Sequence, residues 1–479
     1  MKLRELYPHD AVEFSYFLRQ VLNMSDSERR RILVAAMITC FNGSFMGSSI
    51  NVAVPAMAED FGMNPDELTW VLTAFLIAAA AGLLPFGRLA DIKGRRKIYL
   101  LGLYCICIAT LGCALAGSYE VMVAMRFAQG FAMSMIFGTC MAYLVSCYPP
   151  QSRGKVIGLT GAFVYGGLSV GPFIGGFFTE FWSWRMIFVF TGIAMLINLI
   201  LMLKVKTEWA GDAKQKFDYA GAAVYAAMII LFLYSLSSWS ASENAGRLLF
   251  LSAVLFVLFV WIQHNAKSPL LKLSLFKNIT FAMSNAAALI HYSATFALSF
   301  VLSLYLQVVR GMDAFSAGML LLIQPIVMAV LSPKAGALSD KFPPRLIASF
   351  GMAIMMVSIF AFSFIDKTEP LYLIGINLAF VGLGFALFSA PNNNAILSAA
   401  PKQFYGIASS VLAAMRLTGQ ALSMAIVSLL LSSFAADAMQ DNYVEIMLSA
   451  FQHIFRLFAI LCVFALLASL ARGGQNNCE

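Results

Sequence analysis

The chain has 479 residues, of which 60% are hydrophobic and only 12% are charged, and its mean hydropathy is +0.80. So few charges cannot solvate the surface of a soluble protein of this size, which excludes an ordinary soluble domain. The apolar runs are about 20 residues long, the length that a helix needs to cross the hydrocarbon core. They lack the short alternating segments of a membrane β-barrel. We therefore expect an all-α integral membrane fold.

The sequence predicts about fourteen membrane spans, each placed to within several residues. Ser25 and Glu28 precede the first span with the spacing of a capping box, and no cleavable signal peptide is apparent. In chain order the spans begin near Leu33, Leu68, Ile98, Val121, Val156, Arg185, Tyr219, Leu248, Thr280, Ala314, Arg345, Leu371, Tyr405 and Ser449.

The basic residues predict how these spans are oriented. If the N-terminus is cytoplasmic and the spans alternate, most of the 32 lysines and arginines lie in cytoplasmic segments. Arg185, Arg247, Arg310 and Lys367 then fall outside. This is the positive-inside pattern, and it predicts a multi-pass protein of the inner (cytoplasmic) membrane with both termini cytoplasmic. The net charge of +8 then reflects orientation, and nucleic-acid binding is not expected.

A short cationic loop between the second and third spans is partly repeated later in the chain. It reads Gly87-Arg-Leu-Ala-Asp91-Ile-Lys-Gly94-Arg95-Arg96-Lys97, and Gly336-Ala-Leu-Ser-Asp340 repeats its first five positions after the tenth span. An offset of eight spans predicts a 6+2+6 arrangement. The expected units are a cytoplasmic segment 1–31, a six-helix bundle 32–205, two extra helices with linkers 206–267, a second six-helix bundle 268–472 and a cytoplasmic tail 473–479.

Together these features resemble the major facilitator superfamily, and within it the 14-helix drug:proton antiporters. The cationic loop resembles the signature loop of the superfamily, and Arg126-Phe-Ala-Gln129-Gly130 is similar to its R-x-x-Q-G motif. The antiporter branch is indicated by Gly166-Gly-Leu-Ser-Val-Gly171-Pro172-Phe-Ile-Gly175-Gly176, Asn51-Val-Ala-Val-Pro55, Trp184-Arg-Met-Ile-Phe188, Leu306-Gln307-x-x-x-Gly311, Pro391-Asn392-Asn393-Asn394 and Arg416-Leu-Thr-Gly419-Gln420.

The resemblance implies proton-coupled efflux of amphiphilic small molecules and roles for the motif residues. It implies a substrate and proton pathway at Asn51, Arg126, Gln129, Gln307, Asn392, Asn393, Arg416 and Gln420. It implies a conformational latch at Gly87, Asp91, Gly94, Arg95, Arg96 and Asp340. It also implies packing of the fifth span through Gly167, Gly171, Pro172, Gly175 and Gly176. The alternative for the loop is that its positive charge only orients the protein.

One departure from the branch changes the expected substrate. Met46 stands where the branch usually has an aspartate, and no carboxylate lies clearly at mid-membrane. The ionisable side chains left inside spans are Arg126, Arg416, Arg456 and His291. A charge in the bilayer costs about 2.5 kcal/mol or more, so it is usually functional. These residues predict neutral or anionic substrates. Arg126 could instead be structural, and Arg456 could reach the interface.

His291 is the one mid-span group that could titrate near neutral pH, so we expect it in the proton pathway. The alternatives are that His291 only packs, or that carboxylates at loop edges, such as Asp60 or Asp91, carry the proton. The sequence has no nucleotide-binding or nucleophile motif, and Cys105-x-Cys107 is too tight for zinc. We therefore expect no enzyme activity, cofactor or metal.

Three function classes remain open. The first is a multidrug-type antiporter with a lipid bilayer, a small-molecule substrate, a proton gradient and a periplasmic adaptor protein as partners. The second is a carrier for a specific anionic or neutral metabolite, by uniport or symport. The third is a non-transporting sensor built on the same fold, because fold alone does not fix function.

Overall fold

A computed structural model describes residues 24–64, 67–148, 150–208, 216–239, 242–266, 268–339, 342–400, 405–435 and 443–472. Within these ranges the regular structure is helical throughout, and fourteen helical segments are long and apolar enough to cross a membrane. The predicted all-α fold and its fourteen spans are confirmed. Five predicted starts coincide with the observed ones, and the largest error is at the first helix, which begins at Asp26 and not near Leu33.

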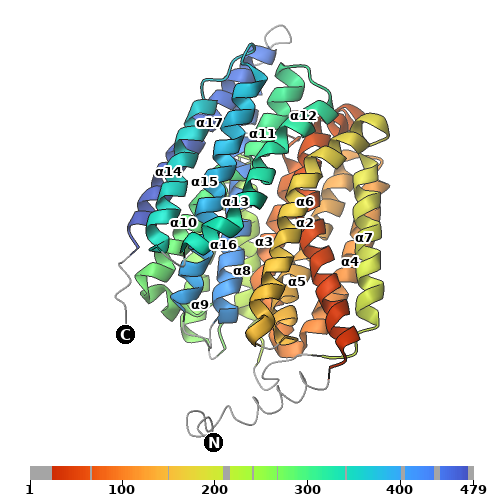
Figure 1. Ribbon diagram of the computed structural model, residues 1–479, viewed down its shortest axis with the longest axis vertical. Coiled ribbons are helices and arrows are strands. Elements are labelled where there is room, and N and C mark those ends of the chain that lie inside the picture. The colour runs from red at the N-terminus through yellow and green to blue at the C-terminus, as the bar shows by residue number, and fades with distance from the viewer. Residues whose placement is uncertain are drawn as a thin grey trace, which may run out of the picture.

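The first six spans are single helices. They are α2 (Asp26–Phe61), α3 (Trp70–Lys93), α4 (Arg95–Ala114), α5 (Tyr119–Ser146), α6 (Pro150–Phe181) and α7 (Arg185–Leu203). Two further helices follow, α8 (Tyr219–Ser237) and α9 (Ala245–Asn265). We call the end of the molecule where α2 begins the inner end, at the bottom of Figure 1, and the opposite end the outer end.

In the last six spans, two are interrupted. A 3-10 turn η1 (Leu273–Lys277) precedes α10 (Ile279–Thr295), which continues as α11 (Leu298–Leu304) and a π-helical turn η2 (Tyr305–Val309). The next span is divided into α12 (Ala314–Leu321) and α13 (Ile323–Ser339). The chain ends with α14 (Pro344–Phe362), α15 (Leu371–Ser398), α16 (Tyr405–Ala435) and α17 (Tyr443–Leu470).

The helices form two bundles that lie side by side (Figure 1). In the first half α2 packs against α6 and α7, and α5 packs against α3 and α4. In the second half α10 packs against α16 and α17, and α15 packs against α13 and α14. Large apolar side chains such as Ile108 and Leu115 are 72% and 74% exposed. In a bilayer such side chains contact lipid, which explains why so much apolar surface remains uncovered.

Of the two extra helices, α8 contacts both halves and α9 is peripheral. Helix α8 contacts α3 of the first half and α16 of the second, while α9 packs mainly on α8. The hydroxyl of Tyr225 on α8 donates to the carbonyl of Ala80 on α3 at 3.2 Å. The hydroxyl of Ser428 on α16 donates to the carbonyl of Ser237 on α8 at 2.9 Å. Helix α8 is therefore hydrogen-bonded to both halves.

The start of α2 bears out half of the predicted capping box. The hydroxyl of Ser25 accepts the backbone N–H of Glu28 at 3.2 Å, as an N-cap does. The Glu28 carboxylate does not return to Ser25. It accepts the N–H of Lys206 at 2.8 Å and the hydroxyl of Thr207 at 3.3 Å. A side chain expected to act locally thus fixes the segment that follows α7 to the inner end of α2.

Glycines on one face of α6 allow close contact with α2. A Cβ atom added at Gly167 would lie 2.4 Å from the carbonyl oxygen of Phe41, and one at Gly175 would lie 2.7 Å from Cβ of Ser49. Both distances are too short for any side chain, so the two backbones touch, as small residues allow in membrane bundles. Gly166, next to Gly167 in the chain, has open space beside it.

This difference between neighbours gives a matched test of the α2–α6 contact. We expect Gly167→Ala to lower the melting temperature in detergent, because the methyl group forces two helices apart at a cost of about 1–3 kcal/mol. Gly166→Ala should leave it unchanged or raise it slightly, because alanine favours helix more than glycine does. Intrinsic-fluorescence melting measures both, and equal melting temperatures for the two variants would contradict the packing.

Candidate functional site

Arg126 is enclosed within the first half and only 1% exposed. Its Nε donates to the carbonyl of Val71 at 2.7 Å, and its Nη1 donates to Oε1 of Gln129 at 2.6 Å and to Sδ of Met46 at 3.4 Å. The guanidinium also lies 4.6 Å from the centre of the Phe75 ring, in cation–π geometry. These contacts link α5 to α2 and α3. They support the alternative that Arg126 is structural, and its place in a substrate pathway stays a prediction.

Gln129 extends this network to a fourth helix. Its Nε2 donates to the hydroxyl of Thr110 on α4 at 2.8 Å, while its Oε1 holds Arg126. Both polar ends of the side chain are therefore satisfied inside the bundle. No described acidic residue forms an ion pair with Arg126. The positive charge is thus held by dipoles, a thioether and an aromatic ring.

The structure shows the effect of methionine at position 46, where the antiporter branch usually has an aspartate. Met46 contacts the guanidinium of Arg126 directly. The carboxylate oxygens of an aspartate and the sulfur of a methionine are the same number of bonds from Cα, so the two side chains reach equally far with these atoms. An aspartate here would therefore face Arg126 and neutralise it. With methionine in this place, the charge of Arg126 is uncompensated.

His291 is fully buried within the second half, between α10, α14 and α15. Its Nδ1 lies 3.3 Å from Sδ of Met352, and its ring lies 4.2 Å from that of Phe388 and 4.9 Å from that of Phe385. Its Nε2 is buried without a hydrogen-bond partner. This environment favours the packing alternative in the conformation seen here, and a role as proton carrier stays a prediction.

Arg416 differs from Arg126 in facing the region between the halves. Its helix, α16, packs against α3 and α8 as well as α10. The Nε of Arg416 is buried and has no hydrogen-bond partner. The Arg416 side chain lies in the neighbourhood of Cys40 of α2 and Tyr165 of α6, two helices of the opposite half. The arrangement leaves a cation near the interface that a solute could use. Gln420, one turn further along α16, is half-buried.

The asparagine motif of α15 lies toward the inner end. Oδ1 of buried Asn392 accepts a hydrogen bond from Nη2 of Arg472, just beyond α17. Arg345 in turn donates to the backbone carbonyl of Arg472 at 3.1 Å. Burial lowers the pKa of Arg472 to about 10, which keeps it cationic at neutral pH. Asn392 thus joins the inner ends of α15 and α17, whereas Asn393 beside it is half-buried.

Two carboxylates hold the loop predicted as a latch: Asp91, which the sequence indicated, and Glu208, which it did not. Asp91 accepts from Nε and Nη2 of Arg95 at 3.0 and 2.9 Å. Gly94 has a φ of +114°, and a Cβ there would lie 2.7 Å from Cδ of Glu208. Glu208 accepts the N–H of Arg96 at 2.8 Å at the start of α4. Gly94 thus supplies both the turn and the space for Glu208.

The latch function itself stays a prediction. A Cβ at Gly87 would lie 3.9 Å from the hydroxyl of Ser410 on α16, so the loop lies close to the second half. Asp340, the counterpart of Asp91 in the second half, lies outside the described residues. Nothing in the spacing of Glu208 or Arg472 marked them as partners of these motifs, because both follow the end of a span in sequence and reach the motifs only after folding.

Two predicted residues lie toward the outer end. Nε2 of Gln307 donates to the carbonyl of Val52 on α2 at 3.1 Å and to the hydroxyl of Ser303 at 2.9 Å. Asn51 is 4% exposed, and its Oδ1 has no hydrogen-bond partner. Gln307 therefore joins the two halves, which its motif alone did not indicate.

Comparison with known proteins gives consistent matches. The sequence model of the Major Facilitator Superfamily matches residues 32–424 and 284–473. The chain is 30% identical over 415 residues to a riboflavin transporter, RibZ, of Clostridioides difficile, covering 86% of this chain and 89% of that protein. It is 26% identical over 400 residues to the multidrug resistance protein Stp of Mycobacterium tuberculosis, covering 82% and 74%. It is 24% identical over 406 residues to the tetracenomycin C resistance and export protein of Streptomyces glaucescens, covering 83% and 74%.

Solved structures share the fold at low sequence identity. A transporter of the POT family, crystallised with a thioalcohol-conjugated peptide, superimposes with a TM-score of 0.69 at 15% identity, covering 92% of this chain and 95% of that chain. A D-xylose–proton symporter superimposes with a TM-score of 0.63 at 14% identity, covering 92% and 96%. These similarities establish the architecture alone.

The contact between Met46 and Arg126 leads to a test of charge. We expect Met46→Asp to pair with Arg126 and to shift transport from anionic towards cationic dyes at least severalfold, because a unit charge acts strongly in a low-dielectric interior. Met46→Asn has the same shape without the charge and should leave the ratio unchanged. Uptake of one cationic and one anionic dye into vesicles measures the ratio, and identical ratios for the two variants would refute the expectation.

Proposed function

The chain belongs to the major facilitator superfamily, and on this premise we propose that it exports neutral or anionic amphiphilic molecules in exchange for protons. The family and the drug-efflux type of its relatives confirm the resemblance seen in the motifs. The protein is a multi-pass membrane transporter of small molecules. We propose, beyond this, the charge of the substrate, the direction of transport and its coupling to protons. We also propose that the solute is transported without chemical change.

The observation that carries the charge preference is the contrast between Arg126 and Arg416. Arg126 is surrounded by acceptors within its own half, whereas Arg416 lies between the halves with a buried, unpartnered Nε. Removing a guanidinium from water is costly unless acceptors replace the water. A solute carboxylate or carbonyl beside Arg416 would supply such an acceptor. A cationic solute would be repelled.

The pattern of charges supports the orientation that we propose. Arg29, Arg30 and Arg31 lie in the first two turns of α2, and residues 93–97 span the end of α3 and the start of α4, all at the inner end. Glu59, Asp60 and Glu180 lie at the outer end. Under the positive-inside rule the inner end faces the cytoplasm, with both termini there and the protein in the inner membrane. Export then proceeds towards the outer end, where a periplasmic adaptor could receive the solute.

We propose that residues 32–205 and 268–472 are the two moving bodies, with residues 206–267 between them. Helices α3 and α6 of the first half meet α16, α12 and α13 of the second, which are the contacts that alternating access must rearrange. The proposed proton carrier is His291, and edge carboxylates such as Asp60 and Asp91 are the alternative. The proposed latch is the Gly87–Lys97 loop.

A second candidate is a dedicated carrier for one neutral or anionic metabolite, by uniport or symport. Two observations favour it. A relative at 30% identity is named a riboflavin transporter, and carboxylates, the usual carriers of a coupling proton, are missing from the middle of the spans. Both candidates share Arg416 as the group that recognises the solute, and only the uniport form of the second needs no proton gradient.

Replacement of Arg416 tests the charge preference. We expect Arg416→Gln to weaken binding of anionic substrates by about 2 kcal/mol, the value of a charge-assisted hydrogen bond, with little effect on neutral ones. Arg416→Lys should retain part of the preference. Arg456→Gln is the control, because Arg456 is an exposed arginine of α17. Binding of an anionic and a neutral dye to purified protein gives the measurement, and an equal loss for both dyes would count against a charge role.

Replacement of His291 tests whether this residue carries the proton, and the wild-type protein tests whether transport is coupled at all. If His291 carries the proton, His291→Gln should abolish uphill transport driven by an imposed pH gradient in vesicles, while downhill exchange continues through the unchanged pathway. His453→Gln is the control, because His453 is exposed on α17. If uphill transport persists, edge carboxylates must carry the proton. If wild-type protein shows none, the uncoupled carrier is the better description.

A further inference from the structure

Among the residues that the structure describes, two hydrogen bonds join the halves at the outer end. Gln307 of the π-helical turn η2 donates to the carbonyl of Val52 on α2 at 3.1 Å. The backbone N–H of Ala314, which begins α12, donates to Oε2 of Glu180 on α6 at 3.3 Å. Beside this second bond a Cβ at Gly176 would lie 2.5 Å from the carbonyl oxygen of Ala314, so the two backbones touch. The outer ends of the halves are therefore in contact in this structure.

The acceptor lies in α2 just before a proline. Pro55 lies inside this helix and has no N–H for the carbonyl of Asn51, and its ring crowds the preceding turn. The carbonyl that loses its helical donor is therefore that of Asn51, the residue before Val52. The carbonyl of Val52 lies in the same turn and accepts a hydrogen bond from Gln307 of the opposite half. The Asn-Val-Ala-Val-Pro motif thus presents a backbone acceptor to the partner bundle.

An uncommon helical turn positions the donor. In η2 the N–H of Arg310 bonds to the carbonyl of Tyr305 at 3.1 Å, the spacing of a π-helix. A π turn inserts an extra residue, changes the direction of side chains and is found mainly at functional sites. Gly311, with a φ of +63°, ends the turn. Ser303, one turn earlier, accepts from the same Nε2 of Gln307 at 2.9 Å and restricts its rotamer.

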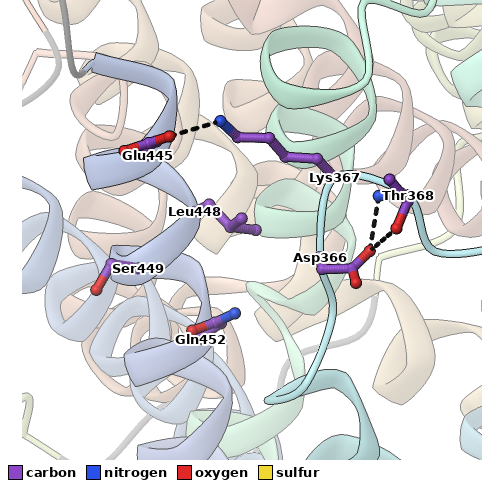
Figure 2. A pocket seen from close by; sticks show the side chains of 7 residues that line it. All are labelled: Asp366, Lys367, Thr368, Glu445, Leu448, Ser449 and Gln452. Atoms are coloured by element: carbon purple, nitrogen blue, oxygen red, sulfur yellow. Dashed lines mark hydrogen bonds and ion pairs between the residues drawn. The ribbon is translucent and has the colours of Figure 1, made fainter.

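The other side of the turn is fixed to the second half. The hydroxyl of Tyr305 donates to the carbonyl of Asp366 at 2.6 Å, and Arg310 donates to the carbonyl of Glu369. Asp366, Lys367 and Thr368 of this loop line a surface hollow of about 410 Å³. Lys367 pairs there with Glu445 of α17 at 3.1 Å (Figure 2). The turn therefore moves with the second half and presents Gln307 to the first.

We propose that Gln307 is the positioning residue of an outer gate, whose hydrogen bond to the Val52 carbonyl holds the outer ends together. Release of solute at the outer end requires this bond to break, and its return favours opening at the inner end. The proposal depends on transport by alternating access, and it is independent of substrate charge and of proton coupling. In this proposal Gln307 affects the equilibrium between the outward-open and inward-open conformations and does not contact the solute.

Hydrogen–deuterium exchange of the full-length protein in lipid nanodiscs, without solute or pH gradient, tests the gate. In Gln307→Leu the loss of one neutral hydrogen bond should increase the population with separated outer ends about two- to tenfold. Exchange should rise in residues 52–61 of α2, across the interface from the substitution. It should fall at the inner ends of α3 and α16, at residues 83–90 and 407–415, because the two ends open alternately.

A second glutamine provides the control. Nε2 of Gln452 donates to the carbonyl of Ile365 at 2.8 Å, also toward the outer end but within the second half. Gln452→Leu should raise exchange in residues 363–368 and leave α2 unchanged. Unchanged exchange in residues 52–61 of Gln307→Leu would overturn the proposal. So would a rise there without protection of the inner ends, since that is local fraying. Gln307→Asn, one methylene shorter, should show the same pattern if the leucine variant is unstable.

Discussion

The bilayer interior supplies no water to a polar group, and the rest of this structure follows from that constraint. It requires helices, because each backbone N–H and C=O must be satisfied within its own segment. It also explains the buried network of the first half, where Asn198 of α7 donates to Thr39 of α2 at 2.9 Å and Thr39 contacts the hydroxyl of Tyr99 on α4 at 2.6 Å. Such bonds help to fix which helices are neighbours. Lipid tails are as apolar as the side chains of another helix, so the hydrophobic effect does not by itself bring two helices together.

The same constraint separates side chains that look alike in the sequence. Arg126 and Arg416 are both arginines in apolar spans, yet one is enclosed by acceptors and the other has a buried Nε without a hydrogen-bond partner. His291 is surrounded by Phe385, Phe388 and Met352, which makes it part of the packed core in this conformation. Charge in a span thus identifies positions of interest, and only the neighbours decide between packing, recognition and proton transfer.

The spans could be predicted from the sequence because their length and hydropathy are set by the membrane, a property external to the chain. The N-cap at Ser25 could be predicted because its partner lies three residues away. The partners of Glu28 and Gly94 could not, because Lys206, Thr207 and Glu208 are more than a hundred residues distant. The π turn at Tyr305–Val309 was missed for a related reason: its extra residue is stabilised by the loop after α14, which no local pattern reveals.

Helix α8 has a consequence for how far the halves can travel. It is hydrogen-bonded to α3 through Tyr225 and to α16 through Ser428, two helices that belong to different bundles. If one bundle turns against the other, α8 must either move with one bundle or shift relative to both, and at least one of these hydrogen bonds must then change. Helix α8 therefore adds a second contact between the bundles beside the direct contact of α3 with α16, whereas α9 packs mainly on α8. Without α8, the bundles would keep only the direct contact of α3 with α16 at this place, so the extra helix enlarges the surface along which the two halves meet.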